Sequence, residues 1–155
     1  MALDINKLKQ LREETGVSFS VCKKALEETD NDIEAAKKKL SEWGVKKAAD
    51  KMDRTTSQGV IASYVHHNKK VAALLEIQTE TDFVSGNEEF QKLAQELAMQ
   101  AASVPAENVE ELLAQQYIRE PKKTIDDLIK DAVLKFGENI KIARFARWSL
   151  GGGTE

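Results

Sequence analysis

The chain contains few of the residues that define several protein classes. Its single cysteine, Cys22, cannot form an internal disulfide. Its only histidines, His66 and His67, are adjacent in sequence and would point to opposite sides of a strand, so they make a poor metal pair. No apolar run approaches the ~18 residues that span a membrane, and the N-terminus lacks the basic and apolar regions of a signal peptide. We therefore expect a cytoplasmic protein with no membrane association, bound metal or cofactor.

Motifs of phosphate and redox chemistry are also missing. The sequence has no Gly-x-x-x-x-Gly-Lys loop, no Gly-x-Gly-x-x-Gly and no Cys-x-x-Cys. A net charge of −3 argues against a general nucleic-acid binder, which usually has a basic surplus. A nucleophilic Cys22 would need a histidine base, and both histidines lie in another segment. These absences disfavour an enzyme and direct contact with nucleic acid.

The charge is unevenly distributed along the chain. Residues 55–118 contain 3 basic and 9 acidic side chains, whereas residues 1–54 and 119–155 have small positive net charges. An acidic middle segment has two interpretations. It can be a solvated surface, or it can steer the protein towards a basic partner, since a field of one sign speeds encounter.

At 155 residues the chain can hold one ordinary domain, or a small module and a compact core. Residues 1–44 are predicted to form a bundle of three short helices, and such a unit has a marginal core that should dock on something. The loop between the first two helices has two interpretations: either Phe19 closes the small core, or at least one of Val17 and Phe19 is exposed. The expected boundary residues are Asp4, Ser18 and either Asp30 or Asn31 as N-caps, with Gly16 and Gly44 at the C-terminal ends.

The remaining sequence predicts an α+β unit at residues 58–150, after a helical linker at 45–57 and before a flexible tail at 151–155. Three strands should form an antiparallel sheet packed with helices, and His66 and His67 should lie in the hairpin turn. The expected strands are 59–65, 71–78 and 139–148; the expected helices begin after Asn87 and near Val109, and at Ile125 after a capping box at Thr124.

The last predicted strand, 139–148, is partly apolar on both faces. Strict alternation places Ile140, Ile142, Arg144, Ala146 and Trp148 on one face and the intervening residues on the other. A three-stranded sheet covered on one side should have one wet face. The pattern therefore indicates that a second copy of the chain or another protein covers the outer face.

The tetrad Thr81-Asp82-Phe83-Val84 follows a buried strand, where the chain must leave the sheet. An aromatic residue at such a corner can fold into the core or point outward towards another protein. Asp82 favours an exposed tip, because an unpaired carboxylate is costly to bury.

Four ordered motifs give the chain a resemblance to translation elongation factor Ts, in a short form with a single half-core. The resemblance extends over roughly residues 3–148. The motifs are Leu11-Arg12-Glu13-Glu14-Thr15-Gly16 with Cys22-Lys23-Lys24-Ala25-Leu26, then Gly59-Val60-Ile61, then the tetrad, and then Gly137-Glu138-Asn139-Ile140 with Arg144.

The resemblance implies a guanine-nucleotide exchange factor that releases GDP from elongation factor Tu. It implies a ubiquitin-associated-like fold for the N-terminal bundle, and a homodimer, because short members of the family pair. Phe83 would be a wedge that disturbs the magnesium and phosphate site of the GTPase, with Asp82 beside it. The partner-binding residues that it implies are Thr81, Asp82, Phe83, Val84, Arg12, Phe19, Ser20, Lys23 and Lys51.

Two other hypotheses remain open. The runner-up is a non-enzymatic binding module that has the same fold but no exchange activity. The third is a small enzyme that uses Cys22. The chain also departs from the family pattern, with Phe19-Ser20 where two methionines are common, Val21 where an acid is common and Glu80 in place of glutamine.

Overall fold

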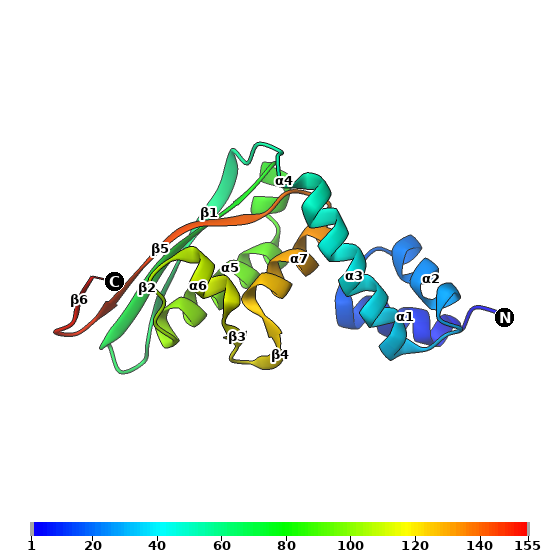
Figure 1. The fold of residues 1–155 in the computed structure, drawn as a ribbon, viewed down its shortest axis with the longest axis horizontal. Coiled ribbons are helices and arrows are strands. Elements are labelled where there is room, and N and C mark those ends of the chain that lie inside the picture. Colours follow the sequence, from blue (N-terminus) through cyan, green and yellow to red (C-terminus); the bar gives the residue numbers. More distant parts are fainter. Residues whose placement is uncertain (1, 155) are drawn as a thin grey trace.

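The computed structural model describes residues 2–154, which form a helical bundle followed by a sheet with helices packed on one face (Figure 1). The mixed helix and strand architecture confirms the predicted α+β class. The helices are α1 (Ile5–Thr15), α2 (Phe19–Glu28), α3 (Ile33–Lys51), α4 (Asp82–Ser85), α5 (Glu88–Ser103), α6 (Val109–Ala114) and α7 (Ile125–Phe136). The strands are β1 (Gln58–Val65), β2 (Val71–Thr79), β3 (Gln116–Tyr117), β4 (Glu120–Thr124), β5 (Lys141–Ser149) and β6 (Gly153–Thr154).

The N-terminal bundle begins and ends largely as its local sequence predicts. The Asp4 carboxylate accepts the backbone N–H groups of Asn6 and Lys7, and Gly16 ends α1 with a φ of 69°. Ser18 occupies the N-cap position of α2, but its side chain makes no capping hydrogen bond. Val17 is buried in the bundle core whereas Phe19 is 49% exposed, so the loop leaves one of the two residues facing solvent and Phe19 does not close the core.

Two predictions about α3 are wrong. Its N-cap is Asp32, whose side chain accepts the Ala35 N–H; Asp30 and Asn31 instead form a tight turn with φ values of 52° and 65°. The helix also does not end at Gly44. It continues to Lys51 and lies alongside α7, so that part of the predicted linker is the second half of a long helix (Figure 1).

The main sheet has the order β1-β2-β5-β6 and is antiparallel throughout. The hairpin of β1 and β2 turns through His66 and His67, as predicted. The short strand β6 lies within the segment predicted to be a flexible tail, and it pairs with Trp148 and Ser149 of β5. The last residue of that segment, Glu155, lies outside the described residues.

A bulge in β5 reverses the predicted faces of its second half. Glu76 pairs with Arg144 and Ile77 with Ile142, which leaves Ala143 unpaired. One extra residue shifts the two-residue alternation, so the side chains beyond it change faces. Phe145 and Arg147 therefore face the helices with Ile142, whereas Arg144, Ala146 and Trp148 face outward; the prediction that placed these three with Ile140 and Ile142 is wrong.

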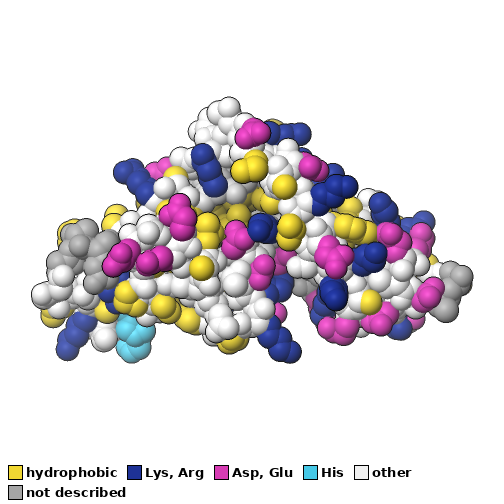
Figure 2. Space-filling view, in the orientation of Figure 1, with side chains coloured by type: hydrophobic (Ala, Val, Ile, Leu, Met, Phe, Trp, Pro, Cys, Tyr) yellow, Lys and Arg dark blue, Asp and Glu magenta, His cyan; other side chains and the backbone are white. Residues whose placement is uncertain are grey.

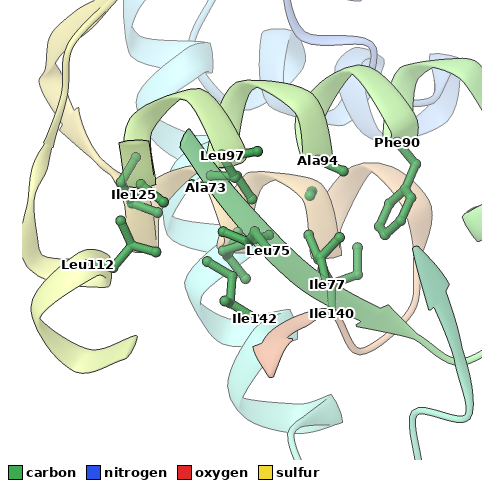
Figure 3. Packing of buried hydrophobic residues seen from close by; sticks show 14 of the residues in the cluster. Ala73, Leu75, Ile77, Phe90, Ala94, Leu97, Leu112, Ile125, Ile140 and Ile142 are labelled. Carbon is green, nitrogen blue, oxygen red and sulfur yellow. The ribbon is translucent and has the colours of Figure 1, made fainter. Parts of the chain in front are cut away.

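The main core lies between the sheet and helices α5, α6 and α7 (Figure 3). Leu97, Ala94 and Phe90 on α5 point towards alternate residues of β2, because a helical period of 3–4 and a strand period of 2 each present one face. Ile142 of β5, Leu112 of α6 and Ile125 of α7 complete the cluster. This packing fixes β2, whose end leads directly into the tetrad.

The small hairpin of β3 and β4 was not predicted, since the sequence there indicates only an interruption at Pro121. Proline is tolerated because β4 pairs on one side only, with β3. Helix α6 begins at Val109, as predicted, and ends at Ala114. Within residues 2–154, no helix is long and apolar enough to cross a membrane.

Candidate partner-binding site

The tetrad forms a corner with an exposed aromatic tip. Thr81 is the N-cap of the short helix α4, which contains the other three residues. Phe83 is 88% exposed and Asp82 is also exposed, whereas Val84 is buried in the core. Leaving a phenyl ring in water forgoes the ~1.5–3 kcal/mol that its burial would contribute. Phe83 therefore adds little to the stability of this fold and is available to a partner.

The corner is held by the carboxylate of Glu138, which lies just before β5. Glu138 Oε1 accepts the Thr79 hydroxyl at 2.7 Å and the backbone N–H groups of Glu80 and Thr81 at 3.2 and 3.0 Å. Glu138 Oε2 accepts the Thr81 hydroxyl at 2.6 Å. Burial alone would raise the pKa of Glu138, but these hydrogen bonds favour the ionised form and hold the pKa below its usual value of 4.5.

A second carboxylate makes the contact reciprocal. Glu80 Oε2 accepts the backbone N–H of Asn139 at 2.6 Å, and Glu80 Oε1 lies 3.6 Å from Arg54 Nη1. The side-chain amide of Asn139 donates in turn, through Nδ2, to the carbonyl oxygens of Met52 and Arg54. The segment that follows α3 is therefore bonded to the same corner, and Figure 1 shows the end of α3 close to α4. These bonds involve Glu80, one of the residues that depart from the family pattern.

Four of the five predicted contact residues outside the tetrad lie on the bundle. Arg12 on α1 and Phe19, Ser20 and Lys23 on α2 are all exposed. Lys51 is half-buried at the far end of α3, so it lies nearer the corner than the bundle (Figure 1). The structure thus brings the predicted residues together in two groups connected by α3, and Figure 2 shows charges of both signs over the bundle.

Cys22 is buried in the bundle core, with its thiol 3.5 Å from the Val17 carbonyl oxygen. Burial raises the pKa of this thiol, which disfavours the reactive thiolate.

His66 lies at the turn between β1 and β2, where its Nδ1 is 2.9 Å from the Tyr64 hydroxyl. In the part of the chain that the structure describes, no group of three or more His, Cys, Asp or Glu side chains could hold a metal ion.

The outer face of the sheet presents exposed apolar side chains and is not covered by any helix described in the structure (Figure 1). Ile61 and Val65 of β1, Leu74 of β2 and Trp148 of β5 are each more than half exposed on it. Register places Ile61 opposite Glu76, which pairs with Arg144 on its other side, and the side chains of Glu76 and Arg144 form an ion pair of 3.0 Å. Val65 and Trp148 flank Ala72 towards the other end of β2. This surface is called the outer sheet face below.

Sequence reasoning gave no role to Glu138, Asn139 or Arg54. Glu138 and Asn139 belong to the Gly137-Glu138-Asn139-Ile140 motif, but the motif was assigned only to a strand. One signal was present: an antiparallel partner of the strand before the tetrad must begin beside the point where that strand ends. Two polar residues at that start are therefore well placed to contact the tetrad.

Comparison with known proteins identifies relatives along nearly the whole chain. The family model "Elongation factor TS" matches residues 80–154, and "Elongation factor Ts, mitochondrial, N-terminal" matches residues 1–50. Elongation factor Ts of Coprothermobacter proteolyticus is 37% identical over 196 aligned positions, covering 97% of this chain and 100% of the relative. The protein of the same name from Nitratidesulfovibrio vulgaris is 39% identical, covering 97% of this chain and 98% of the relative.

A third relative, elongation factor Ts of Nostoc punctiforme, is 40% identical over 148 residues, which are 96% of this chain but 46% of that protein. All these matches are to translation elongation factors. The chain belongs to the elongation factor Ts family. Family membership supports a role in translation elongation and protein biosynthesis.

Proposed function

We propose that this chain is a guanine-nucleotide exchange factor that releases GDP from elongation factor Tu, with Phe83 as the wedge that enters the GTPase domain and disturbs its magnesium and phosphate site. The observation that supports the proposal best is the 88% exposure of Phe83 on a corner whose neighbours are fixed. An exchange factor needs no catalytic group of its own. It binds the nucleotide-free GTPase more tightly than the GDP form, and by linkage it weakens GDP binding by the same factor.

The bundle supplies the second contact in this proposal, through Arg12, Phe19, Ser20 and Lys23, with Lys51 between the two groups. Residues 1–44 and 58–150 are then two docking units of one protein, connected by 45–57. Linking two contacts raises the effective concentration of the second once the first has formed. The continuous helix α3 supports this arrangement, because a helix that packs on α7 limits the relative motion of the two groups.

We also propose that two copies of the chain pair through the outer sheet face. A two-fold interface must be self-complementary. The outer sheet face supports this, because it presents exposed apolar side chains together with both an acid, Glu76, and a base, Arg144. The proposed partners are therefore elongation factor Tu and a second copy, and the proposed location is the cytoplasm, where translation takes place.

The test is the rate at which elongation factor Tu loses a fluorescent GDP when the chain and excess unlabelled nucleotide are added. Wild type should accelerate the release. Phe83→Ala should reduce the acceleration by about 30-fold, since truncating a central aromatic anchor of an interface costs 2 kcal/mol or more. The control is Ile118→Ala, which truncates an exposed apolar residue in the turn between β3 and β4. This variant should accelerate GDP release as much as wild type does.

Two outcomes would contradict the proposal. If the chain binds elongation factor Tu but does not accelerate release, it is the binding module of the alternative hypothesis. If Phe83→Ala retains full activity, exchange occurs without the wedge. Full activity of Cys22→Ser would reject the remaining hypothesis, an enzyme that uses this thiol.

A further inference from the structure

The two strands that support the tetrad continue to contact each other after their backbone pairing ends. These strands are β2 and β5, and their last pair at that end is Gln78 with Lys141. Beyond it, Glu138 accepts the N–H groups of Glu80 and Thr81, and Glu80 accepts the N–H of Asn139. Each segment therefore uses a side-chain carboxylate to satisfy backbone donors of the other. Glu80, Thr81, Glu138 and Asn139 are called the carboxylate clamp below.

The clamp determines where α4 begins. Thr81 is bound to Glu138 through both its N–H and its hydroxyl. Its carbonyl oxygen accepts the Ser85 N–H at 3.2 Å, which closes the first turn of α4. Hydrogen bonds to an ionised carboxylate are stronger than neutral ones and favour a defined geometry. The position of Thr81, and with it the start of the helix, thus depends on one side chain that is distant in sequence.

The Phe83 side chain, at 88% exposure, has little packing of its own to hold it. Its direction is set by the residues on either side. On one side Val84 and Ser85 are buried, and on the other Thr81 is held by the clamp. Loss of the clamp would leave Phe83 attached to the core at one end only, so the ring would sample several directions instead of one.

We propose that Glu138 is a positioning residue for nucleotide exchange and acts through Phe83. This inference rests on the proposed function, and it adds a residue that does not itself need to touch the GTPase. A wedge that is already oriented loses less conformational freedom when it binds, which raises the affinity for the nucleotide-free partner. Glu138 therefore contributes to exchange only as long as Phe83 is present.

A double-mutant cycle tests this dependence, with GDP release from elongation factor Tu as the measurement. Glu138→Ala should slow the accelerated release by about tenfold, which corresponds to ~1.4 kcal/mol. In the Phe83→Ala background the same change should slow the residual release by less than about twofold. Glu110→Ala, which removes an exposed carboxylate on α6, is the matched control and should have no effect in either background.

A second readout measures the corner itself. Hydrogen exchange at the amides of Glu80, Thr81 and Ser85 should be at least about tenfold faster in Glu138→Ala than in wild type, because the acceptor that protects the first two is gone. Should Glu138→Ala fail to fold, Glu138→Gln serves instead. It retains the shape and one acceptor oxygen, and it should show the same dependence on Phe83 with smaller effects.

The outcomes separate the two proposals. No acceleration by the wild-type chain rejects the proposed function, and the role of Glu138 in exchange with it. Acceleration by wild type, with Glu138→Ala slowing release equally in both backgrounds, rejects only the role of Glu138. Unchanged amide exchange at Glu80 and Thr81 rejects it as well.

Discussion

A Cβ on Gly44 would lie 2.9 Å from the backbone carbonyl oxygen of Lys130, so α3 and α7 approach each other closely at this point. A glycine inside a helix normally costs about 1 kcal/mol relative to alanine. Its presence here is explained by packing: a side chain would push apart the two helices that connect the bundle to the core. Gly44 is thus a contact residue between helices, and not the helix end that the sequence suggested.

The first prediction concerns Gly44→Ala. Alanine should gain about 1 kcal/mol in helix propensity, but displacing a backbone atom of α7 should cost more, within the roughly 1–3 kcal/mol typical of overpacking. We expect net destabilisation of about 1 kcal/mol, measured by urea unfolding. Val45→Ala, an exposed change on the same helix, should alter stability by less than about 0.5 kcal/mol. A stabilised Gly44→Ala variant would show that α7 can move away at no cost.

The second prediction contrasts two phenylalanines that are seven residues apart. Phe83 is 88% exposed and Phe90 is 0% exposed. Phe83→Ala should change the free energy of unfolding by less than about 0.5 kcal/mol, whereas Phe90→Ala should cost about 3–5 kcal/mol because it leaves a cavity between α5 and the sheet. Thermal and urea unfolding of both variants measure this. Strong destabilisation by Phe83→Ala would mean that the ring packs into the core in solution.

Much of this arrangement follows from local sequence. The capping box at Thr124 and the N-cap at Asn87 are short-range signals, and each lies where it was predicted. The exposure of Phe83 was also anticipated from the adjacent carboxylate. Such features are readable because the interacting groups lie within a few residues of one another.

Features that depend on distant residues were missed. The bulge at Ala143 reverses the faces of β5, and it is defined only by the register with Glu76 and Ile77 of β2. The role of Glu138 likewise depends on residues nearly 60 positions earlier in the chain. Alternation along one strand cannot reveal an extra residue relative to its partner, because the bulge is a property of the pair.

The third prediction is a dependence of stability on acid pH that is due to Glu138. Its pKa in the folded state lies below the usual value of 4.5, so the folded state is more stable when Glu138 is ionised than when it is protonated. The stabilisation is complete above pH 4.5 and is lost as the pH falls through the lower, folded-state pKa. The difference in unfolding free energy between wild type and Glu138→Gln should therefore be largest near neutral pH and shrink below pH 4.5.

Urea unfolding of both proteins over this pH range measures that difference. The pKa values of Glu14 and Glu76 are also lowered, mainly by hydrogen bonds from Lys37 and Gln78 respectively. Their contributions to the pH dependence are present in both proteins and cancel in the difference. Glu110→Gln shows the effect of removing an exposed carboxylate. A difference that stays constant on acidification would mean that the hydrogen bonds at the tetrad do not depend on the charge of Glu138.

The fourth prediction tests the outer sheet face. Leu74 lies in β2, an interior strand of the sheet, and is 54% exposed, so Leu74→Glu should leave the fold of one chain nearly intact. In a two-fold pair through this face, however, the new carboxylate would be buried without a partner, which costs several kcal/mol. Sedimentation should give wild type a mass of twice the 17.3 kDa of one chain, falling towards one chain on dilution, and Leu74→Glu a mass of one chain throughout.

The same charge placed on another exposed apolar residue is the control for this experiment. Ile118 lies in the turn between β3 and β4, away from the outer sheet face. The Ile118→Glu variant should therefore form the same dimer as wild type. Wild type that sediments as one chain at every concentration would reject the dimer. A dimer that persists in Leu74→Glu would place the interface elsewhere, since two opposed carboxylates at the centre of a buried sheet face would repel each other as well as lose their hydration.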